Sequence, residues 1–463
     1  MIESAPLLLS SDGYNLNRSV RLRSSATAYF QRTPAGAGSL TAWTWSGWVK
    51  RGALGVESML FSAGTGTSNP RSLLSFNATT DTLDFGDNAT GALWYELITT
   101  AVFRDPAAWY HIVAVYDSAN ATSTDRMRLY VNGTRLTSFS TASYPVLSTS
   151  SVTNTAIVHR IGRYAGGAET AYFDGCMTEV NFIGGQALTA ASFGEYNLYG
   201  QWIPKKYAGT YGTNGFYLNF NDNSGVTATT IGKDSSGLGN NWTPNNISVT
   251  AGSTYDSMTD VPTLTSATAA NFAVISPINS NATISGGNLT VTYASTVQTK
   301  NIATISITGK IYFESTFGGQ VGTNNTYFGV GSRGTYSSYN SSIPLGGDSF
   351  AWAVGTNNSE VGKRGAGVYT TLAAGASSAG DIFMVAVDPT GGKIWFGKNG
   401  TWYASGDPAN GTSPAFTGLP AELFAIVDLY GASGSQTVNA NFGQRPFTYT
   451  PPTGYLALNT FNL

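Results

Sequence analysis

Two segments of the chain repeat one local pattern, and that pattern constrains the fold more than any other feature of the sequence. Residues 109–117 read Trp-Tyr-His-Ile-Val-Ala-Val-Tyr-Asp, and 127–133 read Met-Arg-Leu-Tyr-Val-Asn-Gly. Residues 382–388 and 393–400 repeat the order of strand, Asp-led turn, strand and Asn-Gly. Asn-Gly tolerates positive φ at both central turn positions, which favours the tight hairpin turn that matches strand twist. The pattern predicts one β-hairpin in each half of the chain.

The rest of the chain fits the same class. Short alternating runs are separated by Gly, Asp-Pro and Ser/Thr clusters, and helical periodicity is nearly absent apart from one turn at 189–196. Aromatic residues make up 13% and charged residues only 11%, which excludes a disordered chain. We therefore predict an all-β protein built from two antiparallel β-sandwiches.

The composition changes after Tyr196, and this change divides the chain. Residues 197–265 are rich in Gly, Asn, Ser, Thr and Pro but keep aromatic side chains such as Trp202 and Phe216, which a flexible linker would lack. We predict an N-terminal arm (1–14), a first sandwich (15–196), an ordered connector (197–270), a second sandwich (271–447) and an extended C-terminal arm (448–463).

Charge and composition exclude several classes of partner. The chain has 24 basic and 26 acidic residues, a net charge of -2, and no basic stripe, so we expect no nucleic-acid partner. No run approaches the roughly 20 apolar residues that a membrane-spanning helix needs. One cysteine and two histidines exclude a cysteine metal cluster and leave little for imidazole chemistry.

Acidic residues give a weak case for catalysis or metal binding. Asp174 and Glu179 are the closest mixed pair in the first sandwich, but a spacing of five places them on opposite faces of a strand. We therefore expect no enzyme activity. Asp81, Asp84 and Asp87 are spaced three apart and could offer oxygen ligands to Ca²⁺, although the same segment also reads as a short strand with capping turns. We expect no cofactor, with Ca²⁺ as the open alternative.

Aromatic residues in predicted loops are the candidate ligand-binding residues. Tyr336 and Tyr339 lie in a loop, and Trp402 and Tyr403 follow the turn at Asn399-Gly400. Exposed aromatic rings stack on sugar faces or anchor protein partners, because they bring large contact area at low entropy cost. The alternative is that each ring fixes its own loop.

Three motifs of the first half carry a resemblance to a known family. They are Trp-Thr-Trp-Ser-Gly-Trp-Val-Lys at 43–50, the hairpin at 109–133, and Phe-Asp-Gly-Cys-Met-Thr-Glu-Val at 173–180. In this order they resemble a concanavalin A-like, laminin G-like lectin jelly roll. The second half resembles a SPRY domain through 309–314, 327–331, 393–400 and the Asn-Phe-Gly strand at 438–443.

The tandem of the two sandwiches resembles bacteriophage virion proteins of the tail-fibre or head-surface kind. This resemblance implies a non-enzymatic virion structural protein that attaches to host-surface glycan or decorates the particle. It implies other virion proteins as partners and a homo-oligomer, with a trimer favoured by analogy with fibre proteins and the C-terminal arm docked on a neighbour. The alternative function is a polysaccharide-degrading enzyme of the lectin-like glucanase fold.

Overall fold

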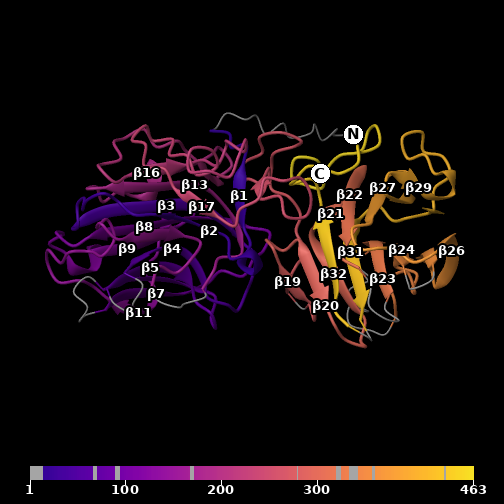
Figure 1. The fold of residues 1–463 in the computed structure, drawn as a ribbon, viewed down its shortest axis with the longest axis horizontal. Coiled ribbons are helices and arrows are strands. Elements are labelled where there is room, and N and C mark those ends of the chain that lie inside the picture. Colours follow the sequence, from indigo (N-terminus) through magenta and orange to yellow (C-terminus); the bar gives the residue numbers. More distant parts are fainter. Residues whose placement is uncertain are drawn as a thin grey trace.

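The computed structural model describes residues 14–65, 70–88, 94–166, 171–278, 280–319, 325–332, 343–356, 360–431 and 434–463. Antiparallel sheets dominate these residues, which confirms the all-β prediction. Two halves lie side by side along the long axis, the first in indigo to magenta and the second in salmon to yellow (Figure 1). Helical structure in the described residues is limited to short 3-10 turns, namely η1 (Ser24–Ala26), η2 (Ser123–Asp125), η3 (Ala190–Ser192) and η5 (Tyr403–Ser405). None of the helices in these ranges is long and apolar enough to cross a membrane.

The first half is a sandwich of two sheets. Sheet 1 runs in the order β10 (Thr134–Arg135), β9 (Met127–Val131), β8 (Trp109–Asp117), β3 (Ala42–Arg51), β13 (Gly175–Gly184), β1 (Ser19–Leu22) and β18 (Ser257–Met258), with β16 (Phe216–Leu218) also paired to β13. Sheet 2 runs in the order β11 (Phe139–Ser143), β7 (Tyr95–Val102), β6 (Thr82–Asn88), β5 (Arg71–Phe76), β4 (Ser58–Gly64), β12 (Val158–Ile161), β2 (Tyr29–Arg32) and β17 (Thr243–Asn245).

The connector is ordered, as predicted, because it completes the first sandwich. Its strands β16 and β18 extend sheet 1, and β17 pairs with β2 at the edge of sheet 2. A small hairpin of β14 (Gly194–Tyr196) and β15 (Trp202–Pro204) opens the connector. Trp242 of the connector is 1% exposed and packs in the first core against Phe216. The aromatic side chains that argued against a flexible linker therefore form the contacts that hold it.

The three tryptophans of β3 divide between two cores, as their sequence parity requires. Trp43 and Trp45 point between sheets 1 and 2 and pack with the first core. Trp48 points to the other face of sheet 1 and packs with Trp109 in the cluster that continues into the second half. Both faces of this sheet are therefore covered.

The second half is also a sandwich. Sheet 3 runs in the order β19 (Thr283–Ser285), β20 (Thr290–Tyr293), β32 (Gln436–Asn441), β22 (Ile311–Phe317), β27 (Ile382–Asp388), β28 (Lys393–Lys398) and β29 (Thr401–Trp402), with β30 (Phe416–Thr417) also on β28. Sheet 4 runs in the order β21 (Thr299–Ile307), β31 (Leu423–Tyr430), β23 (Asn325–Gly331), β24 (Ala351–Thr356), β25 (Glu360–Gly365) and β26 (Val368–Ala374).

Both predicted Asn-Gly hairpin turns are confirmed. Asn132 and Gly133 have φ values of 47° and 83°, and Asn399 and Gly400 have 50° and 83°. In each turn the asparagine side chain accepts a backbone N–H from a neighbouring strand, from His111 in β8 and from Ile382 at the start of β27. Asparagine therefore serves twice in each turn, through its positive φ and through its side-chain oxygen.

Buried polar contacts join the two halves. Lys50 Nζ donates to Asp260 Oδ2 at 2.8 Å, to Asn271 Oδ1 at 2.7 Å and to the Phe272 carbonyl at 2.7 Å, so all three ammonium protons are used. Asp174 accepts the N–H groups of Gly286 and Gly287 at 3.0 and 2.6 Å. Lys50 and Asp174 are therefore both hydrogen-bonded, as the burial of a charge requires.

The C-terminal arm is extended, as predicted, but it packs on its own chain. Tyr455 is 5% exposed and lies edge-on to Trp395 in sheet 3, and Leu458 is fully buried in the second core. Leu456 forms a parallel bridge to Ile311. The arm was expected to dock on a neighbour, but Tyr455 and Leu458 are buried within their own chain. Tyr455 packs beside Trp395 on sheet 3, and Leu458 joins the second core.

Candidate functional site

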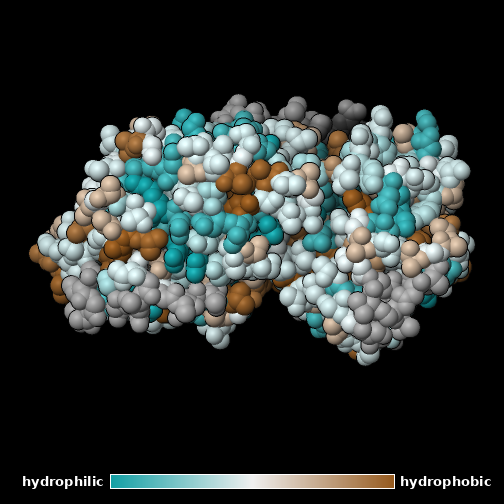
Figure 2. All heavy atoms as spheres, viewed as in Figure 1, coloured by the Kyte–Doolittle hydropathy of each residue, from teal (hydrophilic) through white to brown (hydrophobic). Residues whose placement is uncertain are grey.

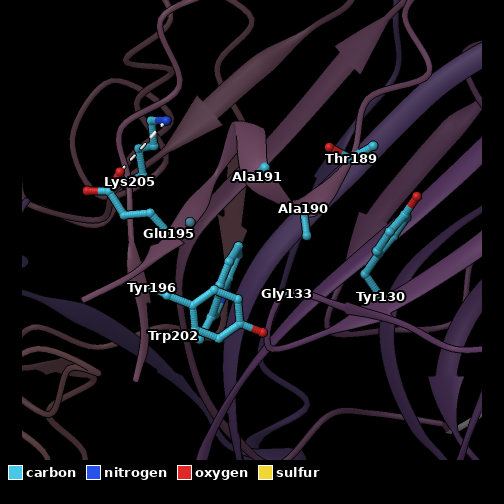
Figure 3. Close-up of a pocket in the computed structure, with 10 residues that line it drawn as sticks. Tyr130, Gly133, Thr189, Ala190, Ala191, Glu195, Tyr196, Trp202 and Lys205 are labelled. Atoms are coloured by element: carbon cyan, nitrogen blue, oxygen red, sulfur yellow. Dashed lines mark ion pairs between the residues drawn. The ribbon is translucent and has the colours of Figure 1, made fainter. Parts of the chain in front are cut away.

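A cavity of about 310 Å³ opens on the outer side of sheet 1 and is the candidate functional site (Figure 3). We call it the Trp202 pocket. It is bounded by β9, the turn after it, η3 and the β14–β15 hairpin. Its lining residues are Tyr130, Gly133, Thr189, Ala190, Ala191, Gly194, Glu195, Tyr196, Trp202 and Lys205. A concave site of this size with aromatic walls and few polar groups is the usual form of a small-ligand site.

The indole of Trp202 is held by a buried hydrogen-bond chain. Trp202 Nε1 donates to His111 Nδ1 at 2.9 Å, and His111 Nε2 lies 2.9 Å from Ser46 Oγ. The indole N–H is a donor only, so His111 Nδ1 must be the acceptor and Nε2 carries the proton that goes to Ser46. Burial lowers the pKa of His111 to about 3, which keeps the ring neutral in this tautomer.

Two glycines let the indole lie against the backbone. A Cβ on Gly133 would come within 2.5 Å of the Trp202 ring, and one on Gly194 within 2.4 Å. No real side chain tolerates such distances, so both positions require glycine for the ring to reach its place. Gly133 is also the second residue of the predicted hairpin turn. The Asn-Gly turn that the sequence predicted therefore forms the hairpin and also part of the pocket wall.

The rim of the pocket combines an exposed ring with an ion pair. Tyr196 is 57% exposed and stands edge-on to Trp202, with ring centroids 4.9 Å apart. Glu195 and Lys205 form a surface ion pair at 3.8 Å on one side of the cavity, and Tyr130 lies on the other (Figure 3). Rings offer a stacking surface, while the carboxylate and ammonium offer acceptors and donors for hydroxyl groups.

Of the four residues predicted to bind ligand, two are placed by the structure. Trp402 is half-buried and packs on the cluster around Tyr312, with ring centroids 6.4 Å apart. Tyr403 packs instead against the second core, and its hydroxyl is buried. These two rings contact different clusters. Their assignment as ligand-binding residues stays a prediction. Tyr336 and Tyr339 lie outside the described residues.

The two acids weighed for catalysis lie in separate settings. Asp174 receives hydrogen bonds from Ser24, Gly286 and Gly287, so it acts as a structural clamp. Glu179 is 5% exposed and accepts hydrogen bonds from Tyr217 at 2.6 Å and Tyr14 at 3.3 Å.

Glu179 also carries a strained backbone. Its φ of 54° falls at a bulge in β13, where the pairing with β3 shifts between Thr178 and Asn181. Burial raises the pKa of its carboxyl to about 7, although the two tyrosine hydroxyls oppose that change. The spacing of five predicted that Asp174 and Glu179 lie on opposite faces of a regular strand. A bulge breaks this alternation of faces, and the spacing alone does not reveal it.

The three aspartates considered for Ca²⁺ do not converge. Asp81 pairs with Arg51 and Arg104, at 3.0 and 2.8 Å. Asp87 points into the first core and accepts from Ser151, whereas Asp84 lies on the outer face of sheet 2. Within the described ranges no group of three or more His, Cys, Asp or Glu side chains is arranged to hold a metal ion.

The comparisons with known proteins agree with the fold of the first half. The model of the concanavalin A-like lectin/glucanases superfamily matches residues 24–192, within the predicted first sandwich. No curated protein sequence matches the chain. The first sandwich therefore matches the family that its motifs resemble.

Similar solved structures represent both sandwiches. The SPRY domain of human HERC1 has 19% identity, covers 36% of this chain and 96% of its own, and gives a TM-score of 0.29. Domains LG4–5 of the mouse laminin α1 chain have 8% identity. The match covers 98% of this chain and 99% of the laminin chain, with a TM-score of 0.31. A Bacteroides ovatus protein proposed to bind carbohydrate has 18% identity. The match covers 50% of this chain and 59% of that protein, with a TM-score of 0.33.

Proposed function

We propose that this protein is a non-enzymatic adhesin whose first sandwich binds glycan through the Trp202 pocket. The observation that carries the proposal is the rigid aromatic floor, where Trp202 is locked between Gly133, Gly194 and His111. A ring held in this way loses little entropy when a sugar stacks on it. The ion pair at the rim supplies hydrogen-bond partners for sugar hydroxyls. The match to a family that is named for lectins supports the same function.

A matched pair of tyrosines tests this proposal. Tyr196 and Tyr199 lie on one hairpin and are both 57% exposed, but only Tyr196 lines the pocket. Wild-type protein is screened on a glycan array, and the strongest ligand is then titrated by calorimetry. We expect Tyr196→Ala to weaken binding about fivefold or more, because a stacked ring contributes about 1 kcal/mol. Equal binding by Tyr196→Ala and Tyr199→Ala would reject the pocket.

The proposed place of action is the virion surface, in a bacteriophage tail fibre or on the head. It rests on the resemblance of the tandem of a lectin-type sandwich and a SPRY-like sandwich. Figure 2 shows a surface with few strongly hydrophobic patches, which suits a particle protein exposed to solvent. Mass spectrometry of purified particles tests this placement. Light scattering of the intact protein tests the proposed homotrimer.

A second candidate function is polysaccharide hydrolysis on the outer face of sheet 2. Asp84 and Glu96 lie diagonally on neighbouring strands, because Asp84 pairs with Ile98 and Gly86 pairs with Glu96. Burial, and then the nearby charge of Glu96, raise the pKa of Asp84 to about 8. Glycoside hydrolysis needs two carboxyl groups, one of which holds a proton to donate, and Asp84 with its raised pKa could be that acid.

The same face also gives a reason to prefer binding over hydrolysis. The Trp94 ring lies so close over Gly86 that a Cβ there would meet it at 2.1 Å. Trp94 Nε1 also donates to Glu96 Oε1 at 2.6 Å. The ring therefore covers the backbone opposite Glu96 and engages one oxygen of that carboxylate, which leaves it less available to a substrate. Sugar release that is abolished by Asp84→Asn would favour the hydrolase.

A further inference from the structure

A pair of arginines that has no counter-ion among the described residues lies on the outer face of sheet 2. Arg160 belongs to β12 and pairs with Gln31 and Ser62 on either side, while Arg163 follows the strand and bridges to Tyr172. Tyr29 of β2 completes the group. We call Tyr29, Arg160, Arg163 and Tyr172 the arginine–tyrosine cluster. It lies on a different sheet from the Trp202 pocket.

The two tyrosines hold the guanidinium groups by stacking. The Arg163 guanidinium lies 4.9 Å from the Tyr29 ring centroid and 5.2 Å from that of Tyr172. Arg160 lies 5.8 Å from Tyr29 and donates to the Tyr164 carbonyl at 2.9 Å. Stacking engages the faces of the guanidinium groups and fixes their orientation.

The charge of this pair is not balanced by the described residues. Neither Arg160 nor Arg163 forms an ion pair with a described carboxylate, and the Nε atoms of both are buried without a hydrogen-bond partner. Burial first, and then the charge of Arg163, lower the pKa of Arg160. Two like charges held together with unused donors are costly unless an anion binds between or beside them.

We propose that the arginine–tyrosine cluster binds the carboxylate or sulfate group of an acidic polysaccharide. A guanidinium presents paired N–H donors that match a carboxylate or sulfate bidentately. Two isolated arginines flanked by rings fit one anionic substituent on a sugar chain. A nucleic acid, with a charge at every phosphate, would need the basic stripe that this chain of net charge -2 lacks. The proposal does not depend on the Trp202 pocket.

The test uses the full chain and polymers that differ only in charge. Binding of polygalacturonate is compared with that of its methyl ester, and dextran sulfate with unmodified dextran, by affinity electrophoresis. We expect an acidic polymer of either pair to bind about tenfold more tightly than its neutral form. The acidic polymer that binds more tightly shows whether the preferred substituent is a carboxylate or a sulfate. Binding should weaken as salt concentration rises, because the contact is ionic.

Variants locate the site. Arg163→Gln should weaken binding of the acidic polymer about tenfold. Arg163→Lys keeps the charge but loses the paired guanidinium N–H donors, so its affinity should lie between those of the wild type and Arg163→Gln. Lys233→Gln removes one exposed charge elsewhere and should change binding less than about twofold. Each variant is checked for an unchanged melting temperature, and Tyr199→Ala, which removes an exposed ring that does not line the Trp202 pocket, should leave this binding intact.

Three outcomes would overturn the proposal. The first is wild-type affinity in Arg163→Gln with its fold intact. The second is binding of single-stranded DNA as tight as that of polygalacturonate. The third is binding of the acidic polymer by Glu169→Gln but not by the wild type, because a carboxylate of the chain would then already occupy the site. Glu169 lies outside the described residues.

Discussion

Replacing Glu179 with glutamine should make the protein less sensitive to pH. The carboxyl is 5% exposed, and its pKa is raised from the usual 4.5 to about 7. An acid with a raised pKa in the folded state binds its proton more tightly there than in the unfolded chain. Its stabilising effect is therefore fully present below pH 4.5 and is lost as the pH rises through about 7.

The size of the effect follows from the two pKa values. A difference of this size is worth about 3 kcal/mol at 25 °C. The free energy of unfolding of the wild type, relative to Glu179→Gln, should fall by about 3 kcal/mol across this interval. Asp87 and Asp428 are buried acids whose pKa values are also raised to about 7, so the wild type alone would mix several titrations. The difference between the two proteins cancels them.

Urea unfolding followed by tryptophan fluorescence, at pH steps across this interval, measures the difference. Glu195→Gln is the control, since it makes the same substitution at a carboxyl that is 52% exposed. Parallel curves for the wild type and Glu179→Gln would refute the reasoning. They would mean that water or a nearby cation keeps the carboxyl ionised in the folded protein.

Three further perturbations test other parts of the structure. Asp260→Asn leaves the buried Lys50 ammonium without its charge partner, and should lower the free energy of unfolding by about 3 kcal/mol or more, with both halves melting in one calorimetric transition. Trp402→Ala should lower the free energy of unfolding by about 2 kcal/mol, because the partly buried ring packs on the Tyr312 cluster; an unchanged melting temperature would indicate that the ring is free to bind a ligand. Truncation after Phe447 removes Tyr455 and Leu458 from their buried sites, so the apolar surface beneath them should bind a fluorescent dye. A truncated chain that is as stable as the intact one would contradict the packing of the arm.

Local sequence signals predicted the parts of the fold that are locally determined. The two Asn-Gly turns and the ordered connector each have a signal in a short stretch of the sequence. Turn chemistry acts over a few residues, so the sequence displays it directly.

The C-terminal arm and Glu179 were not predictable in this way. The arm reaches Trp395 and Ile311, which lie far back in the sequence. Glu179 meets Tyr14 across 165 positions and Tyr217 across 38. Spacing carries no signal for such contacts, because they depend on how whole sheets pack.

The Trp202 pocket left one trace in the sequence. Trp202 was recognised as an aromatic residue that orders the connector, and Gly133 as a turn residue. Their contact joins two separately predicted features, and the pocket exists only where they meet. Trp402 shows the opposite case, because its position after a tight turn does not reveal that its ring contacts Tyr312 on its own sheet.

The indole N–H resonance of Trp202 gives the most direct test of glycan binding at the pocket. Protein labelled with ¹⁵N-tryptophan has 10 indole signals, and Trp202→Phe identifies the one that matters. We expect titration with the array-selected oligosaccharide to shift this signal, with saturation at the affinity measured by calorimetry. Saturable binding of the oligosaccharide that leaves the Trp202 signal in place would contradict the account.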